Sequence, residues 1–459
     1  MLTAERAHAI FEKLRDFSSA DDIEALIFGS RSALTRFANN TIHQNVAEEN
    51  SAVSVRTVFS GRTARATTNK FDDESLRRVV KSAEALSKVQ HPDPDLLPMP
   101  GDGEARSATT PQRYFSETAS LGPAERAAAV QQIVEIAKRE KLTTAGICSS
   151  SESFEAIFNS RSLARHHAQT SSEISVTMLA KDSSGWQKAN WPDGRQLDAR
   201  RLAEVAAEKA RKSAAPQELP PGKFTVVLEP AAVLDLLGFM FYDFGGMAIL
   251  DQRSFLNDRV GKKIFGDNIT ILDDVSHPLQ SGAGFDGEGV ARQRVELVKN
   301  GVAQQLVYAR GTAEKMKKSE HAAKVGKIAA TGHGFPLPNE VGEAPMNIVV
   351  APPASPQTVE RMIASTPRGV LVTRLWYIRE VDPYEKILTG MTRDGTFLIE
   401  DGKLKHGIRN FRFNQSLIEM LSKVEAMSTP VRASGEESFD MVVPAMKVRD
   451  FNFTEVTKF

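Results

Sequence analysis

The sequence predicts an α+β protein with two domains. Three observations support this class: β-branched runs alternate with amphipathic helical patterns over the first half, a proline-rich segment at 216–221 interrupts the chain, and hairpin signals dominate after it. We therefore expect an N-terminal α+β domain over 1–220 and a mainly antiparallel β domain with a few helices over 222–459. With 459 residues, the chain is long enough for each domain to bury a sizeable core.

The first half alternates helices and strands. Apolar residues at helical spacing predict helices over 3–16, 71–88, 123–140 and 199–214. Strands are expected at 23–28, 32–37, 42–46, 52–59, 62–67, 144–148, 153–159 and 174–180. Asn39-Asn40 and Ser60-Gly61 are turn signals, and the segment 91–112, rich in Pro, Gly, Asp and Ser, is expected to be a long loop.

An internal similarity within the first domain suggests a duplication. The run Phe37-Ala38-Asn39-Asn40, followed by Val53-Ser54-Val55, resembles Phe158-Asn159-Ser160-Arg161 followed by Ile174-Ser175-Val176. The offset is about 121 positions, and a predicted helix follows each unit. We therefore keep two related halves within 1–220 as a hypothesis.

A central stretch from Lys223 to Gly261 combines a strand, a helix and a polar loop. The strand is expected at 224–228, and Pro230 stands where a first helical position tolerates a missing N–H. Apolar residues then recur on one helical face, at Val233, Leu236, Leu237, Met240, Phe241 and Phe244. Gly245-Gly246 is expected to end this helix, because glycine adopts the left-handed cap conformation at little cost.

The second half is dominated by strand patterns. Hairpin turns are expected at Asn300-Gly301, Asp394-Gly395 and Asp401-Gly402. Strands are expected at 294–298, 302–308, 346–351, 370–380, 397–400 and 439–448, and short helices at 311–318, 355–365 and 417–424.

Charge and composition argue against several partners. The 58 basic and 58 acidic residues cancel, so no global positive field exists to hold a nucleic acid, and direct nucleic-acid binding is not expected. The most apolar window, 231–250, contains Asp235 and Asp243, each of which would cost about 2.5–3.5 kcal/mol near a bilayer centre, so no membrane partner is expected.

Cys148 is the single cysteine, which excludes an intrachain disulfide. Met1 to Arg15 has no apolar signal-peptide core, and we expect a cytoplasmic protein.

Several short stretches, in order and spacing, resemble one family. They are Ser254-Phe255-Leu256 with Gly261, Ile271 to Asp274, Phe285 to Val290, Leu388-Thr389-Gly390, Phe397 to Lys403 and Val443 to Val448. On the basis of these stretches, the chain is identified as a member of the TldD/PmbA family of predicted zinc-dependent peptidases. The resemblance covers nearly the whole chain.

The family's metal motif is where this sequence departs. In TldD-type members, an H-E-x-x-x-H motif on the central helix supplies two zinc ligands and a catalytic carboxylate, and a C-terminal cysteine is the third ligand. Here Phe241 and Gly246 fall on the two histidine positions and Tyr242 on the glutamate, and no cysteine follows Cys148. The resemblance therefore implies a PmbA/TldE-like member with no metal ligand and no catalytic residue in this chain, and with zinc on a TldD-type partner.

The resemblance implies a subunit of a proteolytic complex that cleaves unfolded peptides. Phe239, Phe241, Asp286 and Glu288 are the residues we expect to line a peptide channel. Two alternatives stay open: a homodimer that binds peptides without cleaving them, and an enzyme with a relocated site that uses Asp286, Glu288 or a histidine.

Overall fold

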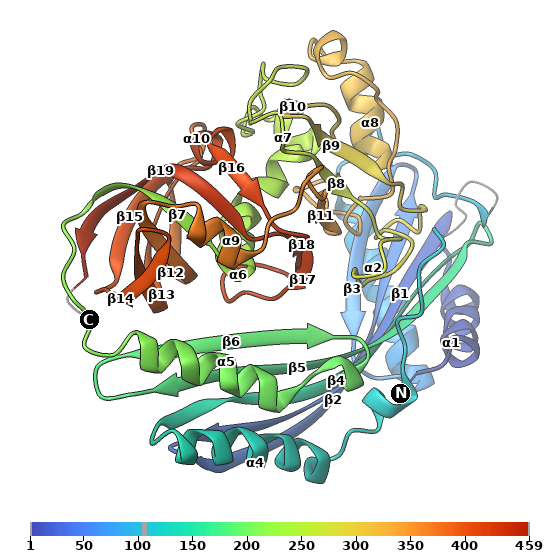
Figure 1. Ribbon diagram of the computed structural model, residues 1–459. Helices are drawn as coiled ribbons and strands as arrows, with labels where there is room; N and C mark the ends of the chain where they lie inside the picture. Colours follow the sequence, from blue (N-terminus) through green and yellow to red (C-terminus); the bar gives the residue numbers. More distant parts are fainter. Residues whose placement is uncertain (1, 103–107, 458–459) are drawn as a thin grey trace.

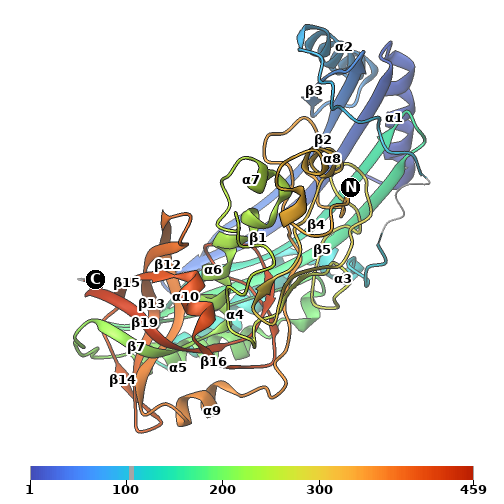
Figure 2. The same ribbon diagram turned by 90° about the horizontal axis from the view of Figure 1, so that it is seen from above.

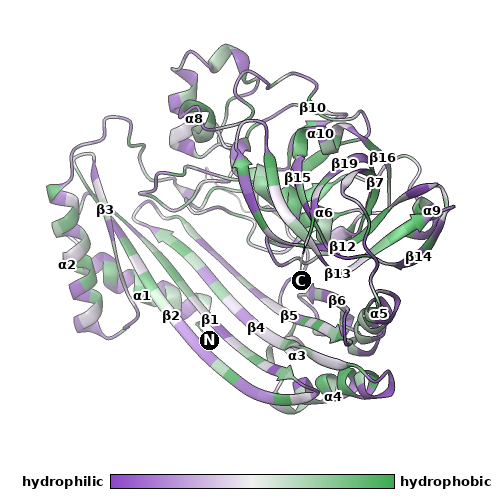
Figure 3. Ribbon diagram, turned by 90° about the vertical axis from the view of Figure 1, so that its left-hand side faces the viewer, coloured by the Kyte–Doolittle hydropathy of each residue, from purple (hydrophilic) through white to green (hydrophobic). Residues whose placement is uncertain are grey.

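The computed structural model, drawn in Figure 1, describes residues 2–102 and 108–457. Within these residues the strands form three sheets, one from residues 22–191 and two from residues 222–456. Figure 2 shows the first sheet extending past the C-terminal half of the chain, and Figure 3 shows its long strands curving around that half. The predicted α+β class is confirmed, and the C-terminal half is rich in strands.

The first sheet has the order β3-β2-β1-β4-β5-β6 and is antiparallel throughout. Its strands are β1 (Asp22–Ala38), β2 (Thr41–Phe59), β3 (Arg62–Thr68), β4 (Thr143–Asn159), β5 (Ala164–Leu179) and β6 (Ser184–Trp191). Its helices are α1 (Ala4–Phe17), α2 (Asp73–Val89), α3 (Ser116–Ala119), α4 (Pro123–Arg139) and α5 (Ala199–Lys212), with a 3₁₀ turn at Gly194–Gln196.

The element order of the first sheet repeats. A helix, three strands and a helix occur first as α1-β1-β2-β3-α2 and again as α4-β4-β5-β6-α5. β4 begins as far after β1 as Phe158 lies after Phe37, which supports the duplication hypothesis. Figure 3 shows α1 and α2 at one end of the sheet and α4 and α5 at the other, and each pair packs on its own apolar cluster.

The strands of this sheet are longer than the sequence predicts. The expected break at Gly29-Ser30 is wrong, since β1 runs unbroken through it. Gly29 pairs with Ser51 on one side and Phe154 on the other, so two neighbouring strands hold the backbone extended where the local signal favours a turn. The breaks expected at 47–51 and 149–152 are absent for the same reason. β6 and the first half of β5 were not predicted at all.

The expected loop at 91–112 has no helix or strand in residues 91–101 and 108–112, and residues 103–107 lie outside the described residues. No helix of the described chain combines the length and the apolar character needed to span a bilayer.

Five strands of the C-terminal half close into a barrel. The neighbours run β12-β7-β19-β15-β13, and a further β12–β13 pairing completes the ring. Closure leaves these strands without free edges. The other sheet has the order β10-β9-β8-β11-β18-β17. Pairing is antiparallel except for β7–β12 and β11–β18.

The strands of the C-terminal half are β7 (Gly222–Leu228), β8 (Ile271–Asp273), β9 (Val295–Lys299), β10 (Val302–Ala303), β11 (Ile348–Val350), β12 (Arg368–Asp382), β13 (Ile387–Glu400), β14 (Lys403–Gly407), β15 (Phe411–Ser416), β16 (Val424–Met427), β17 (Val431–Ala433), β18 (Met441–Val443) and β19 (Met446–Val456). The helices are α6 (Pro230–Leu237), α7 (Gly246–Leu250), α8 (Arg310–Lys317), α9 (Val359–Ala364) and α10 (Leu417–Ser422), with 3₁₀ segments η3 (Gly238–Phe244) and η4 (Ala322–Lys324).

Two of the three expected C-terminal turns are confirmed. Asn300-Gly301 and Asp401-Gly402 have positive φ at both positions and join paired strands. The turn at Asp394-Gly395 is wrong, because both residues lie within β13 and together oppose Thr373 of β12. Their positive φ makes a β-bulge rather than a hairpin, since β12 continues as a partner on both sides.

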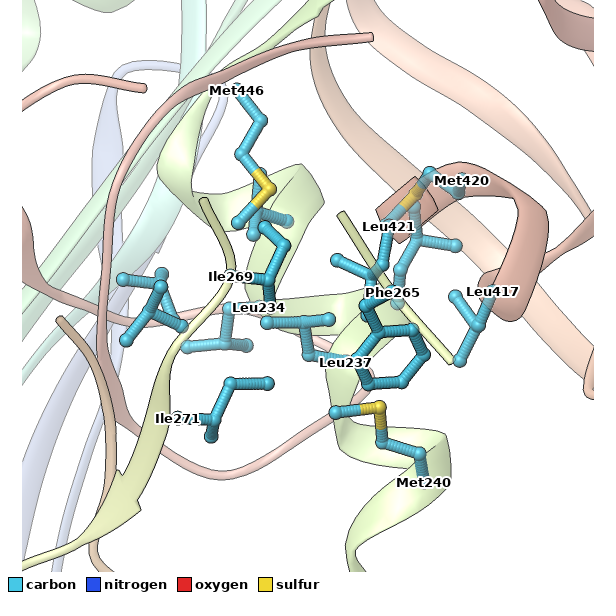
Figure 4. Close-up of a cluster of buried hydrophobic side chains, with 14 of the residues drawn as sticks. Leu234, Leu237, Met240, Phe265, Ile269, Ile271, Leu417, Met420, Leu421 and Met446 are labelled. Atoms are coloured by element: carbon cyan, nitrogen blue, oxygen red, sulfur yellow. The ribbon is translucent and has the colours of Figure 1, made fainter. Parts of the chain in front are cut away.

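The central helix is also shorter than predicted. α6 ends at Leu237, and the chain continues as the 3₁₀ segment η3. Gly245 has a φ of −76° and precedes α7, so the expected left-handed cap at Gly245-Gly246 is wrong. Apolar side chains from α6 and η3 nevertheless face one core, as Figure 4 shows for Leu234, Leu237 and Met240.

A buried ion triad connects the first sheet to the C-terminal half. Glu24 of β1 pairs with Arg56 of β2 at 3.0 Å and with Arg65 of β3 at 2.5 Å. Arg65 also donates through Nε to the carbonyl of Leu337, 2.8 Å away. Because all three charged side chains are largely buried, the triad depends on each of its members.

We expect Glu24→Ala to lower the free energy of unfolding by about 3–5 kcal/mol, because it leaves two guanidinium groups buried without their carboxylate. Urea unfolding followed by circular dichroism measures the change. Glu208→Ala removes an exposed pair with Lys212 and serves as the control, with an expected change below about 1 kcal/mol. Equal effects of the two substitutions would contradict this role of Glu24.

Candidate functional site

The main cavity lies between the first sheet and the C-terminal half. It has a volume of about 620 Å³, within the range of small-molecule and peptide sites. β1 and β4 form one wall. Its lining comprises Leu26, Ile27, Phe28, Glu155, Ala156, Ile157 and Gln169 from the first sheet, and residues 280–283, 285–287, Arg292, 334–336, Met346, Asn347, Phe439 and Asp440 from the C-terminal half.

Asp286 shapes the loop that borders this cavity. Its Oδ1 accepts the N–H groups of Glu288 and Val290, and its Oδ2 accepts that of Gly334, all at 2.8–2.9 Å. Burial raises the pKa of Asp286, and the three N–H donors oppose the rise. Asp286 therefore lines the cavity, while its carboxylate is occupied by backbone N–H groups.

Glu288 lines a second, smaller cavity, and Glu343 binds the backbone of two residues that line it. Glu288 lines a cavity of about 150 Å³ and accepts the N–H of Arg310 at 3.1 Å. Glu343 accepts the N–H groups of Met247 and Ala309 through its two oxygens. Burial raises the pKa of both carboxyls, that of Glu288 to about 7. No sequence signal singled out Glu343, because its partners lie far away in the chain.

A buried aspartate and histidine lie close together behind the cavity wall. Asp273 Oδ1 lies 3.0 Å from His333 Nε2, and Asp273 Oδ2 accepts the N–H groups of Met346 and Asn347. Burial acts to raise the pKa of Asp273, but His333 and the hydrogen bonds outweigh it, and the net shift is downward. No sequence signal joins His333 to Asp273, because the two residues lie far apart in the chain.

Phe241, Tyr242 and Gly246, which the sequence resemblance aligns with the family's metal motif, lie in an aromatic environment. Phe241 is buried, with ring centroids of Phe244 and Phe439 at 6.4 and 6.3 Å. Tyr242 is exposed and stacks on Phe335 at 6.5 Å. A Cβ atom at Gly246 would lie 2.4 Å from the ring of Tyr308.

A zinc ion does not fit these side chains, since tetrahedral zinc sites use histidine, cysteine and carboxylate donors. Among residues 2–102 and 108–457, no three His, Cys, Asp or Glu side chains lie close enough together to hold a metal ion.

The four expected channel residues are not brought together. Asp286 lines the main cavity and Glu288 the smaller one. Phe239 packs against the core, and Phe241 lies behind Phe439, which lines the main cavity. Sequence reasoning missed Phe28, Glu155, Arg292 and Phe439, which have no local motif and meet only through folding.

Comparison with known proteins assigns the family. A model described as the PmbA/TldA metallopeptidase C-terminal domain matches residues 221–455, just over half of the chain, and one for domain 1 matches residues 23–87. The chain belongs to the PmbA/TldD family. Among the relatives of this PmbA/TldD-family chain, Metalloprotease PmbA of Escherichia coli O157:H7 is 21% identical over 413 residues, covering 86% of this chain and 85% of the relative. A Metalloprotease of Methanothermobacter thermautotrophicus is 24% identical over 303 residues, covering 61% of each.

Solved structures share the fold. TldE from Thermococcus kodakarensis aligns with a TM-score of 0.84 and 18% identity, covering 99% of this chain and 100% of that one. A putative modulator of a DNA gyrase from Thermotoga maritima aligns with a TM-score of 0.82 and 17% identity, covering 98% and 100%.

We expect Gly246→Ala to destabilise the protein by about 1–3 kcal/mol, because the new methyl group would overlap the Tyr308 ring. Thermal unfolding measures the change. Gly311→Ala in α8 is the control, since a Cβ there meets no atom within 4 Å and alanine favours the helix, so the variant should be stabilised by up to about 1 kcal/mol. A Gly246→Ala variant as stable as the wild type would contradict the close packing.

Glu288 makes stability depend on pH. Its pKa is about 7 in the folded chain and about 4.5 when unfolded, so the folded state holds a proton that the unfolded state releases between these values. Its contribution to stability is complete below pH 4.5 and is lost as the pH rises through 7. We therefore expect Glu288→Gln to lose less stability than the wild type between pH 5 and 8, by on the order of 2 kcal/mol. Urea unfolding across this range measures it, with Glu314→Gln on the exposed face of α8 as the control; identical profiles for all three proteins would contradict the assignment.

Proposed function

We propose that this chain is the TldE-like, non-metal-binding subunit of a TldD/TldE-type metalloprotease complex that cleaves unfolded peptides. The observation that supports this best is the place of the main cavity. It reaches Phe439, whose ring packs on Phe241, the residue at the first histidine position of the family's metal motif. The cavity thus approaches the position of the family's chemistry with aromatic side chains in place of metal ligands.

The cavity suits an extended peptide of varied sequence. Leu26, Phe28 and Ile157 offer apolar surface, and Gln169 and Asn347 offer amide groups. Apolar walls with a few polar groups hold a ligand without demanding one side chain at every position. The chain would therefore bind and orient the peptide.

The partner would supply the chemistry. A zinc ion polarises the scissile carbonyl and activates a water, and a carboxylate takes the proton of that water. Of the residues of this chain at the corresponding positions, Phe241 and Gly246 would support the shape of the cavity wall by packing on Phe439 and Tyr308, and Tyr242 would remain exposed beside Phe335.

The test is reconstitution. We expect the purified chain alone to contain no stoichiometric zinc and to leave unfolded β-casein uncut. An equimolar mixture with a TldD-type chain that carries the H-E-x-x-x-H motif should cleave casein faster than that partner alone. Replacing the motif glutamate of the partner with glutamine should abolish cleavage. Elemental analysis and gel electrophoresis provide the readouts.

Two results would overturn the proposal. Stoichiometric zinc and proteolysis by the lone chain would place the active site here. A mixture no faster than the partner alone, with this chain forming a peptide-binding homodimer, would favour the binding-module alternative.

A further inference from the structure

Two oppositely charged side chains face the main cavity without a partner. Arg292 follows the loop at 284–291, and Glu155 lies on β4 of the first sheet. Neither side chain makes a hydrogen bond or an ion pair with any residue in the described part of the chain. The two side chains attract each other electrostatically, but they do not form an ion pair.

The backbone around Arg292 is held firmly. Its N–H donates to the carbonyl of Gly284 at 3.0 Å, and the next N–H, of Gln293, donates to Thr331 at 2.9 Å. The Nη1 atom of Arg292 is shielded from solvent and has no acceptor. A guanidinium has five N–H donors in a planar fork that matches a carboxylate, and a buried donor without an acceptor is unfavourable.

The carboxylates near Arg292 are engaged elsewhere. Asp286 uses both of its oxygens to accept three backbone N–H groups. Asp273 pairs with His333 and accepts two further backbone N–H groups. Asp273 and Asp286 attract the charge of Arg292 electrostatically, but neither carboxylate accepts a hydrogen bond from the Arg292 guanidinium. The N–H donors of the Arg292 guanidinium therefore remain available to a ligand.

Glu155 lies on the face of the first sheet that points toward the C-terminal half. It pairs in register with Phe28, and the alternation of β1 and β4 places Leu26 and Ile157 on the same face. The opposite face, with Phe154 and Phe158, packs against α1 and α2. An ionised carboxylate only accepts hydrogen bonds, so Glu155 presents an acceptor to the cavity.

We propose that the main cavity recognises a peptide by a carboxylate, which Arg292 binds, and by an N–H group, which Glu155 accepts. This inference rests on the proposed function, because it names the chemistry of the peptide that the same cavity holds. The carboxylate is either the C-terminus of the peptide or an acidic side chain within it. The apolar walls hold the rest of the peptide without selecting its sequence.

Isothermal titration calorimetry of the full chain with three short peptides tests this. The peptides are Ac-Leu-Ala-Leu-Ala with a free C-terminus, the same peptide as its C-terminal amide, and Ac-Leu-Glu-Leu-Ala as its amide. The free acid should bind at least about tenfold more tightly than the first amide, because a charge-assisted bond to arginine is lost in the amide. Tight binding of the glutamate peptide would assign the contact to a side chain instead.

Variants separate recognition from folding. Arg292→Gln should remove the preference for the carboxylate, whereas Arg292→Lys should retain part of it, since the charge remains but the fork does not. Arg294→Gln is the matched control, because Arg294 is exposed and pairs with Asp274 away from the cavity lining. Glu155→Gln should weaken the binding of the free-acid peptide and of its amide by a similar factor. Thermal unfolding shows whether each variant is folded.

Two results would overturn the carboxylate inference without contradicting peptide binding by the cavity. One is equal affinity for both carboxylate peptides and the first amide. The other is a preference for the carboxylate that persists in folded Arg292→Gln. Binding of none of the three peptides would overturn it as well. In that case, casein cleavage by the mixture with a TldD-type partner decides separately whether the proposed function stands.

Discussion

Buried carboxylates that accept backbone N–H groups hold the irregular part of the C-terminal half in place. Between residues 251 and 347 the chain has few strands and helices, so its backbone groups need partners from elsewhere. Five buried acids provide such partners: Asp243, Asp273, Asp286, Glu288 and Glu343. Burial alone would be costly for a carboxylate, and these hydrogen bonds offset part of that cost.

The same arrangement explains where the cavity lies. The loop at 284–291 is fixed by Asp286, which accepts N–H groups from within this loop and from Gly334, so its outer surface remains free to face the first sheet. The N-terminal half is attached to this half through polar contacts, among them Arg65 to the carbonyl of Leu337 and Arg113 to the carbonyl of Val275, and through an apolar cluster that includes Ile157 and Phe285. These contacts do not fill the whole junction, and the main cavity is the space that remains between the two walls.

The central segment is packed with side chains that are not metal ligands. Phe241 and Gly246, which the sequence resemblance aligns with the family's two histidines, pack against Phe439 and Tyr308. The solved structure of TldE from Thermococcus kodakarensis has the same fold at 18% identity. Fold similarity at that level does not carry the chemistry of a site, which depends on the side chains present.

The sequence by itself determined most of the helices, most of the tight turns and the family. These signals are local: helical spacing in α2 and α4, left-handed turns at Asn300 and Asp401, and short motifs read in order. Tertiary structure alone decided that Gly29 continues a strand and that Asp394 forms a bulge, because neighbouring strands satisfy the backbone there. It also decided the cavity, whose walls come from β1, β4 and loops more than a hundred residues away. Local preference cannot encode such contacts, since their free energy arises only when distant segments pack together.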